Sequence, residues 1–465
     1  MNVVLISTYE LGRQPFGLAS PAAWLREAGA HVTCMDLSRS ALPEEPVRSA
    51  DLVAFYVPMH TATRLAIHWV GRVRELNPHV HLCFFGLYAP INEHCLRKLG
   101  AQTILGGEFE EGLVALVKRL EAAELAGKNS CPTGAQPEPQ PETMISTARQ
   151  RFRVPDRSGL PDLRHYARLE MEGGERRIVG YTEASRGCQH LCRHCPIVPV
   201  YQGRFRIVQR EVVLADIRQQ VAAGATHITF GDPDFWNGIG HSLAIVEALH
   251  REYPRVTYDA TIKIEHLLKY AHLLKRLRET GCLFVTSAVE TIDDRVLRLL
   301  DKGHTREDFV RVAELFREVG LTLSPTFIPF HPWTTVDDYQ ELLALLAELD
   351  LIESVAPVQL AIRLLIPAGS KLLELPELLS RIGKFDEREL SYRWSHADAR
   401  VERLYRDVRR IVSMARQNGL TRKETFSQMW EAARHAAGES SAAASSIEIL
   451  PARATIPYIN EPWFC

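Results

Sequence analysis

Short apolar segments alternate with helical segments at a regular spacing between residues 178 and 365. The apolar segments are IVGYTEAS (178–185), THITFGD (226–232), VTYDATI (256–262), CLFVTSAVE (282–290), LTLSPTFIPF (321–330) and SVAPVQLAIRLL (354–365). Repeated strand–helix units build a parallel sheet that curls into a barrel, with its chemistry at the C-terminal ends of the strands. Eight units close a full barrel and six are visible, so we expect a partial (βα)6 barrel.

A second region of alternation covers the first 120 residues. Apolar runs at 2–7, 52–57, 80–85 and 103–105 are separated by helical patterns, which predicts a Rossmann-like, doubly wound sheet. A proline- and glycine-rich stretch with little periodicity follows and predicts a linker. The residues from 371 onward are charged, and their pattern predicts a helical extension. We expect domain boundaries at 1–122, 123–176, 177–370 and 371–465.

The composition excludes several classes of protein. The formal net charge is −2, whereas a nucleic-acid-binding protein normally carries a basic excess. No run approaches the ~18 apolar residues of a membrane span, and the N-terminus lacks the pattern of a secretory signal. We expect a cytoplasmic protein, in which cysteines stay reduced and a dense cysteine group indicates a metal or catalytic site.

Three of the nine cysteines fall within eight residues, directly after the first barrel strand. Cys188, Cys192 and Cys195 form C-x3-C-x2-C. Zinc is one alternative, because His190 and His194 could complete four ligands, but structural zinc usually joins two separated ligand pairs. Incidental or reactive thiols are another. A [4Fe–4S] cluster held by three thiolates explains the odd number, because one iron then stays open to substrate.

In this position the motif resembles that of the radical S-adenosylmethionine (SAM) superfamily, over about residues 178–370. The resemblance implies that the open iron chelates the amino and carboxylate groups of SAM and that one electron cleaves its sulfonium. It also implies a small-molecule substrate and a reducing partner such as flavodoxin or ferredoxin. In such enzymes the protein supplies positioning and exclusion of water, while the cofactor supplies the difficult chemistry.

The resemblance points to further SAM-binding residues. The segment FGDPDF (230–235) stands where the family has a Gly-Gly-Glu-like segment that receives the SAM ammonium. The departure from Glu leaves open which carboxylate acts, and a plain Asp-Pro turn is the alternative. Glu290 resembles the ribose-binding position, or else caps the next helix. The candidates are Gly231, Asp232, Asp234, Glu290 and, as an adenine contact, Ile328.

Charged residues also stand at the ends of other barrel strands. Arg363 lies within an apolar strand pattern, and a buried charge needs a partner, so a carboxylate or substrate contact is expected, with a strand-edge position as the alternative. Lys263 and Glu265 follow the third strand, where a solvated rim explains them equally well.

The N-terminal region resembles the cobalamin (B12)-binding domain that precedes many radical SAM barrels. The resemblance rests on TILGGEFEEGLVALVKRL (103–120) and on PDRSGLPDL (155–163), which is similar to the joining segment of those proteins. No Asp-x-His-x-x-Gly motif is present, so histidine ligation of cobalt is not supported. The loops 84–90 and 105–111 would receive the nucleotide tail. Cobalamin binding and its loss both stay open, on fold analogy alone.

The chain ends in EPWFC, which resembles the CUAEP/CCAEP-tail group of radical SAM (seleno)proteins. In that group a cysteine is followed by selenocysteine or cysteine and then Ala-Glu-Pro. We expect the natural chain to continue past Cys465 with selenocysteine, with a chance terminal cysteine as the alternative. A vicinal pair of this kind would bind a soft atom such as arsenic or act in redox exchange.

We therefore expect an α/β radical SAM enzyme that cleaves SAM reductively. Its reaction could be cobalamin-dependent methyl transfer or another radical modification. The alternatives are transfer of the aminocarboxypropyl group of SAM to a soft acceptor such as arsenite and, from another class, a non-catalytic Fe–S or zinc-binding sensor. The sequence leaves the substrate and the oligomeric state open.

Overall fold

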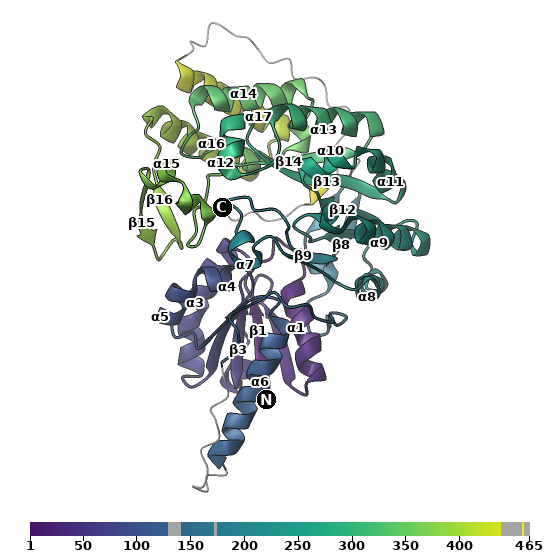
Figure 1. The fold of residues 1–465 in the computed structure, drawn as a ribbon, viewed down its shortest axis with the longest axis vertical. Coiled ribbons are helices and arrows are strands. Elements are labelled where there is room, and N and C mark those ends of the chain that lie inside the picture. The colour runs from purple at the N-terminus through teal and green to yellow at the C-terminus, as the bar shows by residue number, and fades with distance from the viewer. Residues whose placement is uncertain (129–140, 172–173, 439–457, 460–465) are drawn as a thin grey trace.

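The computed structural model describes residues 1–128, 141–171, 174–438 and 458–459. Two α/β parts lie one above the other, the N-terminal part below and the larger part above it (Figure 1). No helix in the described ranges is long and apolar enough to cross a bilayer. Cys131 and Cys465 lie outside the described residues, so the expectations for the tail are not addressed by the structure.

The N-terminal part is built on a parallel sheet with the strand order β2-β1-β3-β4-β5-β6. One apolar cluster lies on each of its faces. This order is that of a doubly wound, flavodoxin-like fold, so the Rossmann-like prediction is confirmed. The elements are β1 (Asn2–Ser7), α1 (Phe16–Glu27), β2 (His31–Asp36), α2 (Glu44–Arg48), β3 (Leu52–Tyr56), α3 (His60–Leu76), β4 (His81–Phe85), α4 (Tyr88–Ile91), α5 (Glu93–Lys98), β5 (Thr103–Gly107), α6 (Glu110–Lys128) and β6 (Ile145–Ser146).

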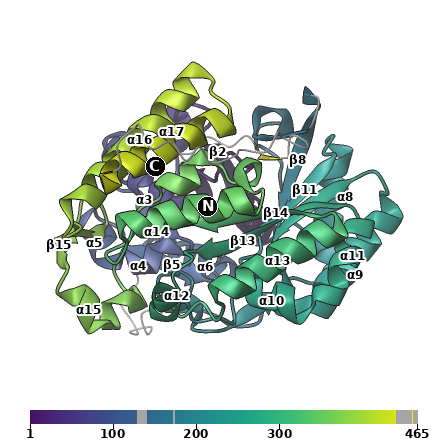
Figure 2. The same cartoon turned by 90° about the horizontal axis from the view of Figure 1, so that it is seen from above.

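The second sheet has the order β14-β13-β12-β11-β8-β7-β17, and its five strands from β8 to β14 are parallel. Helices follow one another around the outside of these strands and cover their apolar side chains (Figure 2). The expected partial barrel is therefore present. Its strands are β8 (Arg176–Thr182), β11 (His227–Phe230), β12 (Thr257–Thr261), β13 (Cys282–Glu290) and β14 (Thr322–Phe327); its helices are α8 (Arg210–Ala222), α9 (Ile239–Glu252), α10 (Ile264–Lys269), α11 (Leu274–Glu279), α12 (Asp294–Leu300), α13 (Arg306–Val319) and α14 (Val336–Glu348).

The prediction of a sixth strand at 354–365 is wrong. Residues Ile352–Ser354 and Pro357–Ala361 form 3-10 turns, and only an isolated parallel bridge joins Arg363 to Phe330 beside β14. Pro357 explains the difference, because proline has no N–H for a strand ladder and favours the first position of a helical turn. The sixth unit therefore contributes one bridge instead of a full strand.

The C-terminal extension is helical as expected, but a hairpin stands between its short first helix, α15 (Pro376–Leu379), and the two long helices. Strands β15 (Ile382–Asp386) and β16 (Ser391–Trp394) pair antiparallel, and helices α16 (Ala399–Asn418) and α17 (Arg422–Ala437) follow. Farther along, β17 (Tyr458–Ile459) pairs antiparallel with β7 (Arg168–Glu170), which itself pairs antiparallel with β8. Strand β17 thus lies at the outer edge of the barrel sheet.

Candidate active site

The cysteine loop begins at the C-terminal end of the first barrel strand. After β8, the short strand β9 (Ser185–Gly187) pairs with β10 (Phe205–Ile207), and the loop between them carries the cysteines and helix α7 (Val198–Tyr201). Gly187 has φ 72°, and a Cβ there would lie 2.4 Å from the Tyr201 ring and 2.5 Å from the Arg204 carbonyl. Only glycine fits this entry into the loop.

The three thiols of the loop lie close enough to interact electrostatically. All three are free, Cys192 is buried, and the other two are partly buried. Burial, together with the neighbouring Cys192 and Cys188 thiols, raises the pKa of Cys195 to about 12. Thiolates are the form that binds metal, so three of them at this place require a cationic group between them. The donor set fits an iron–sulfur cluster, which supplies that charge.

Glu290 lies at the end of β13, between a lysine and a histidine. Its Oε1 is 3.0 Å from Lys302 Nζ and 3.0 Å from His194 Nε2. Burial opposes ionisation, but these two neighbours hold the pKa of Glu290 well below its usual value. The alternative role of helix cap belongs to Asp293, whose carboxylate accepts from the first N–H groups of α12. Ile328 is adjacent, because its N–H donates to the Glu290 carbonyl at 2.8 Å.

The sequence did not point to Lys302. It stands after α12, and its ammonium lies near the Cys192 and Cys195 thiols as well as beside Glu290. Its side chain is 4% exposed, which is rare for lysine and requires a partner. A lysine in a Lys-Gly-His segment after an amphipathic helix carries no signal in the sequence that distinguishes it from a surface residue.

Asp232 is held by the backbone that leads into the cysteine loop. Oδ2 accepts from the Ala184 N–H at 2.9 Å, and Oδ1 accepts from the Ser185 hydroxyl at 2.5 Å. Burial raises the pKa of Asp232 to about 7. The preceding residue, Gly231, has no room for a side chain, because a Cβ there would lie 1.9 Å from the Tyr181 hydroxyl. Both residues position the loop in this structure.

Asp234 faces the cysteine loop directly. Oδ1 accepts from the Trp236 N–H at 3.2 Å, which begins the 3-10 turn Phe235–Gly238. Oδ2 lies 2.7 Å from His266 Nδ1 and 3.4 Å from His190 Nε2. Burial opposes ionisation, but the two histidines lower the pKa of Asp234 to about 2. Of the two aspartates proposed for SAM, Asp234 is the one next to Cys188.

Arg363 is partly buried and has the carboxylate partner that its position in an apolar segment requires. Its guanidinium donates to both oxygens of Glu402 at 2.8 and 3.0 Å and to the Trp394 carbonyl at 2.7 Å. It also stacks on the Trp394 ring, 3.7 Å from the centroid. These contacts join the barrel to the hairpin and to α16, so Arg363 acts as a structural clamp.

The two parts of the molecule meet at a buried arginine just before the cysteine loop. The Arg186 guanidinium lies 2.7 Å from Glu110, 3.4 Å from Glu108 and 2.7 Å from Glu183. Glu108 and Glu110 belong to the 105–111 loop that was expected to receive a nucleotide. In this structure the loop is bound to the barrel instead.

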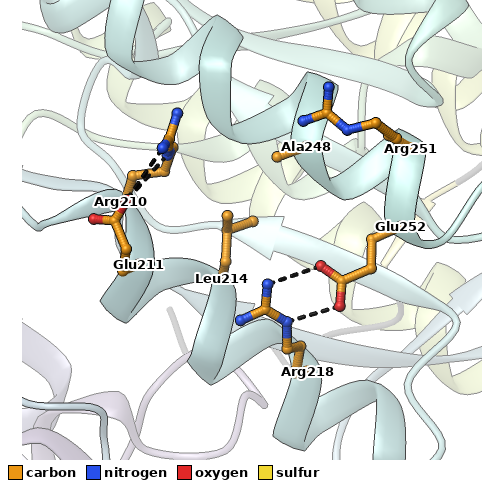
Figure 3. Close-up of a pocket in the computed structure, with 7 residues that line it drawn as sticks. All are labelled: Arg210, Glu211, Leu214, Arg218, Ala248, Arg251 and Glu252. Atoms are coloured by element: carbon orange, nitrogen blue, oxygen red, sulfur yellow. Dashed lines mark hydrogen bonds and ion pairs between the residues drawn. The ribbon is translucent and has the colours of Figure 1, made fainter.

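One surface pocket lies elsewhere, between α8 and α9 on the outside of the barrel (Figure 3). Four of its charged side chains form two pairs: Arg218 donates to Glu252 at 2.7 and 2.9 Å, and Arg210 donates to Glu211 at 3.1 Å. It contains no cysteine, histidine or unpaired acid among its lining residues, and it offers no reactive group.

These features define a class: a partial parallel barrel with a three-cysteine loop at the mouth, preceded by a flavodoxin-like domain. The family comparison agrees, since residues 182–346 match the Radical SAM superfamily. Residues 182–346 are therefore a radical SAM domain, and the cofactors of that superfamily, a [4Fe–4S] cluster and SAM, are those expected from the cysteine motif.

Curated relatives are similar over less than half of this chain. The ribosomal protein uS12 methylthiotransferase RimO of Thermus thermophilus is 29% identical over 192 residues, 38% of this chain and 44% of that protein. The tRNA-2-methylthio-N(6)-dimethylallyladenosine synthase of Sulfurihydrogenibium sp. is 25% identical over 195 residues, 38% of this chain and 42% of that protein. The chain thus spans less than half the length of these relatives.

Solved structures are similar over both parts of the molecule. The cobalamin-dependent SAM radical enzyme OxsB with aqua-cobalamin bound has a TM-score of 0.67, with 15% identity, over 90% of this chain and 67% of that one. The radical SAM methyltransferase TsrM from Kitasatospora setae has a TM-score of 0.58, with 18% identity, over 75% of this chain and 73% of that one. At these identities the likeness shows a shared fold.

Proposed function

We propose that this protein binds a [4Fe–4S] cluster through Cys188, Cys192 and Cys195 and cleaves SAM reductively to modify a small-molecule substrate. The convergence of three thiols, one buried and two partly buried, at the mouth of a partial barrel carries the proposal. When bound, the cluster supplies an open iron and one electron for cleavage of the sulfonium. A small electron-donor protein such as flavodoxin or ferredoxin would provide that electron.

The residues around the loop would bind and orient SAM. Asp234 offers a carboxylate, ionised at neutral pH, for the SAM ammonium on one side of the cysteines. Lys302 offers an ammonium for the SAM carboxylate on the other side, and Glu290 offers acceptors for the ribose hydroxyls. The backbone near Ile328 borders the same end of the sheet and would contact the adenine. Opposite charges on opposite sides would fix the direction in which SAM lies.

The experiment is anaerobic reconstitution followed by product analysis. The wild-type protein and the Cys188→Ser, Cys192→Ser and Cys195→Ser variants are analysed for iron, sulfide and SAM-derived products after addition of a reductant. Cys95→Ser, in α5 of the N-terminal part, is the matched control. We expect 5′-deoxyadenosine from the wild type and the control, and neither cluster nor product from the three variants. An intact wild-type cluster without SAM cleavage in the presence of candidate substrates would contradict the proposal.

Cobalamin-dependent methyl transfer is a second candidate, because the fold is shared with OxsB over 90% of the chain. Aromatic and charged side chains lie at the edge of the N-terminal sheet that would hold cobalamin. Tyr56 packs against Gly17 and Gly86. Arg186 forms an ion pair with Glu110 of the 105–111 loop, and the Tyr88 phenol lies near the Cys195 thiol. A corrin ring bound at this edge would contact these side chains.

Titration of hydroxocobalamin into the protein tests this second candidate. A stable complex after gel filtration, with S-adenosylhomocysteine among the products, would support methyl transfer. Methylthioadenosine in its place would favour aminocarboxypropyl transfer, once spontaneous breakdown of SAM is subtracted.

A further inference from the structure

A second set of metal-binding groups lies beside the first cysteine. Cys188 Sγ, a ring nitrogen of His190 and a carboxylate oxygen of Asp234 all lie within 4.8 Å of one another. The cysteine and the histidine come from the loop after β8, and the aspartate comes from the end of β11. A thiolate, an imidazole and a carboxylate are the ligand types that bind Zn²⁺ and similar ions.

The polar atoms of His190, Asp234 and His266 face a common centre, as metal ligands do. His190 Nε2, Asp234 Oδ2 and His266 Nδ1 are buried, and apart from their contacts with one another they have no hydrogen-bond partner among the described residues. Buried polar atoms normally have such a partner. His190 Nε2 lies 3.4 Å from Asp234 Oδ2. Two ligands at ~2.0–2.1 Å from a tetrahedral ion are separated by roughly 3.4 Å, so an ion would fit between these two atoms.

Neighbouring groups would orient the two side chains. Glu265 Oε2 lies 3.6 Å from His190 Nδ1 and could accept its proton, which would leave Nε2 free to bind metal. Lys263 Nζ lies 3.0 Å from that nitrogen, so metal binding would displace this contact. His266 lies against the other side of Asp234, and its Nε2 is 2.9 Å from the Gln189 amide nitrogen.

We propose that Cys188, His190 and Asp234 form a mononuclear site for a divalent transition-metal ion such as Zn²⁺, with His266 as a positioning residue for Asp234. The site uses only Cys188 of the three cysteines. It therefore fills when the cluster is absent, and the ion and the cluster occupy the loop alternately. The proposal does not depend on SAM cleavage, because it concerns the protein without its cluster.

Cobalt titration tests the site directly. Co²⁺ is added under anaerobic conditions to the full-length protein purified without its cluster, and binding is followed by the thiolate-to-cobalt absorption band and by metal analysis. We expect one ion per chain. Cys188→Ser should abolish the band, and His190→Gln and Asp234→Asn should each weaken binding at least tenfold. His266→Gln should weaken binding about tenfold, as expected for a residue that orients a ligand.

The matched controls are Cys192→Ser and Cys195→Ser, which should keep the band and the stoichiometry. Equal loss in all three cysteine variants would place the ion on the three thiols and would overturn the proposal. Wild-type affinity in both His190→Gln and Asp234→Asn would overturn it as well, and circular dichroism checks that these variants fold. Iron–sulfide reconstitution is scored separately, so failure of the cluster and failure of this site are distinguishable.

Discussion

Glu290 and Lys302 are separated by 12 positions in the chain, yet their charged groups lie 3.0 Å apart at the mouth of the barrel. Their side chains are only 9% and 4% exposed. Glu290 also has φ 71°, a left-handed conformation that is strained for a residue with a side chain. The surrounding packing and the ion pair hold the carboxylate where β13 ends, next to the cysteine loop.

Glu290→Gln should strongly destabilise the protein. The substitution leaves Lys302 buried without a counter-charge, and breaking a buried pair in this way costs about 3–5 kcal/mol. Urea denaturation measures the change in the free energy of unfolding. The control is Glu377→Gln, which removes the partner of Arg295 in an exposed pair and should cost less than about 1 kcal/mol.

Adding Lys302→Met to Glu290→Gln should recover much of the loss, because no unpaired charge then stays buried. Equal effects of Glu290→Gln and Glu377→Gln would show that the Glu290 site is hydrated and that the pair contributes little.

Asp232 should make the stability fall as the pH rises. Burial raises its pKa from 3.8 to about 7, so the folded protein binds this proton more tightly than the unfolded chain does. The contribution of Asp232 is therefore complete below about pH 4 and is lost as the pH rises through 7. Asparagine cannot ionise. Between pH 5 and pH 8 the free energy of unfolding of the wild type should therefore fall by about 2 kcal/mol more than that of the Asp232→Asn variant.

Thermal and urea denaturation of both proteins at pH 5 and pH 8 check this prediction. Parallel loss in the two proteins would mean that Asp232 ionises without cost, for example through access to water.

Gly231→Ala should destabilise the barrel. A Cβ at this position would lie 1.9 Å from the Tyr181 hydroxyl, so the Tyr181 ring must move, and overpacking of this kind costs about 1–3 kcal/mol. Gly240→Ala, at the start of α9, is the matched control, because a Cβ there meets nothing within 4 Å and alanine favours the helix by up to ~1 kcal/mol. The unfolding midpoints should therefore shift in opposite directions; a shift in the same direction would contradict the steric explanation.

Arg186→Met should loosen the contact between the two parts of the molecule. It leaves the buried carboxylates of Glu108 and Glu110 without their cation, at a cost of about 3 kcal/mol or more. Limited proteolysis should detect faster cleavage, and urea denaturation a lower free energy of unfolding. Arg218→Met, which breaks only the exposed pair with Glu252, is the control and should cost less than about 1 kcal/mol. Similar proteolysis of both variants would contradict a structural role for Arg186.

Buried strands were the ones that the sequence predicted correctly. Strands β3 and β4 are buried almost throughout, so each is a continuous apolar run that is visible without a structure. The edge strand β2 was missed because its first half is exposed and reads HVT. The segment at 354–365 is apolar because it packs against the core, yet Pro357 prevents a regular strand there. An apolar pattern therefore predicted burial more reliably than it predicted conformation.

The sequence by itself determined the cysteine loop and the alternation of strands and helices, because both are local: the thiols fall within eight residues, and each strand–helix unit is contiguous. Only the tertiary structure decided which charges surround the loop. His194, Glu290 and Lys302 meet there, as do His190, Asp234 and His266. The reason is that a parallel sheet brings together the ends of strands that are tens of residues apart in the chain, and their side chains carry no mark of that proximity.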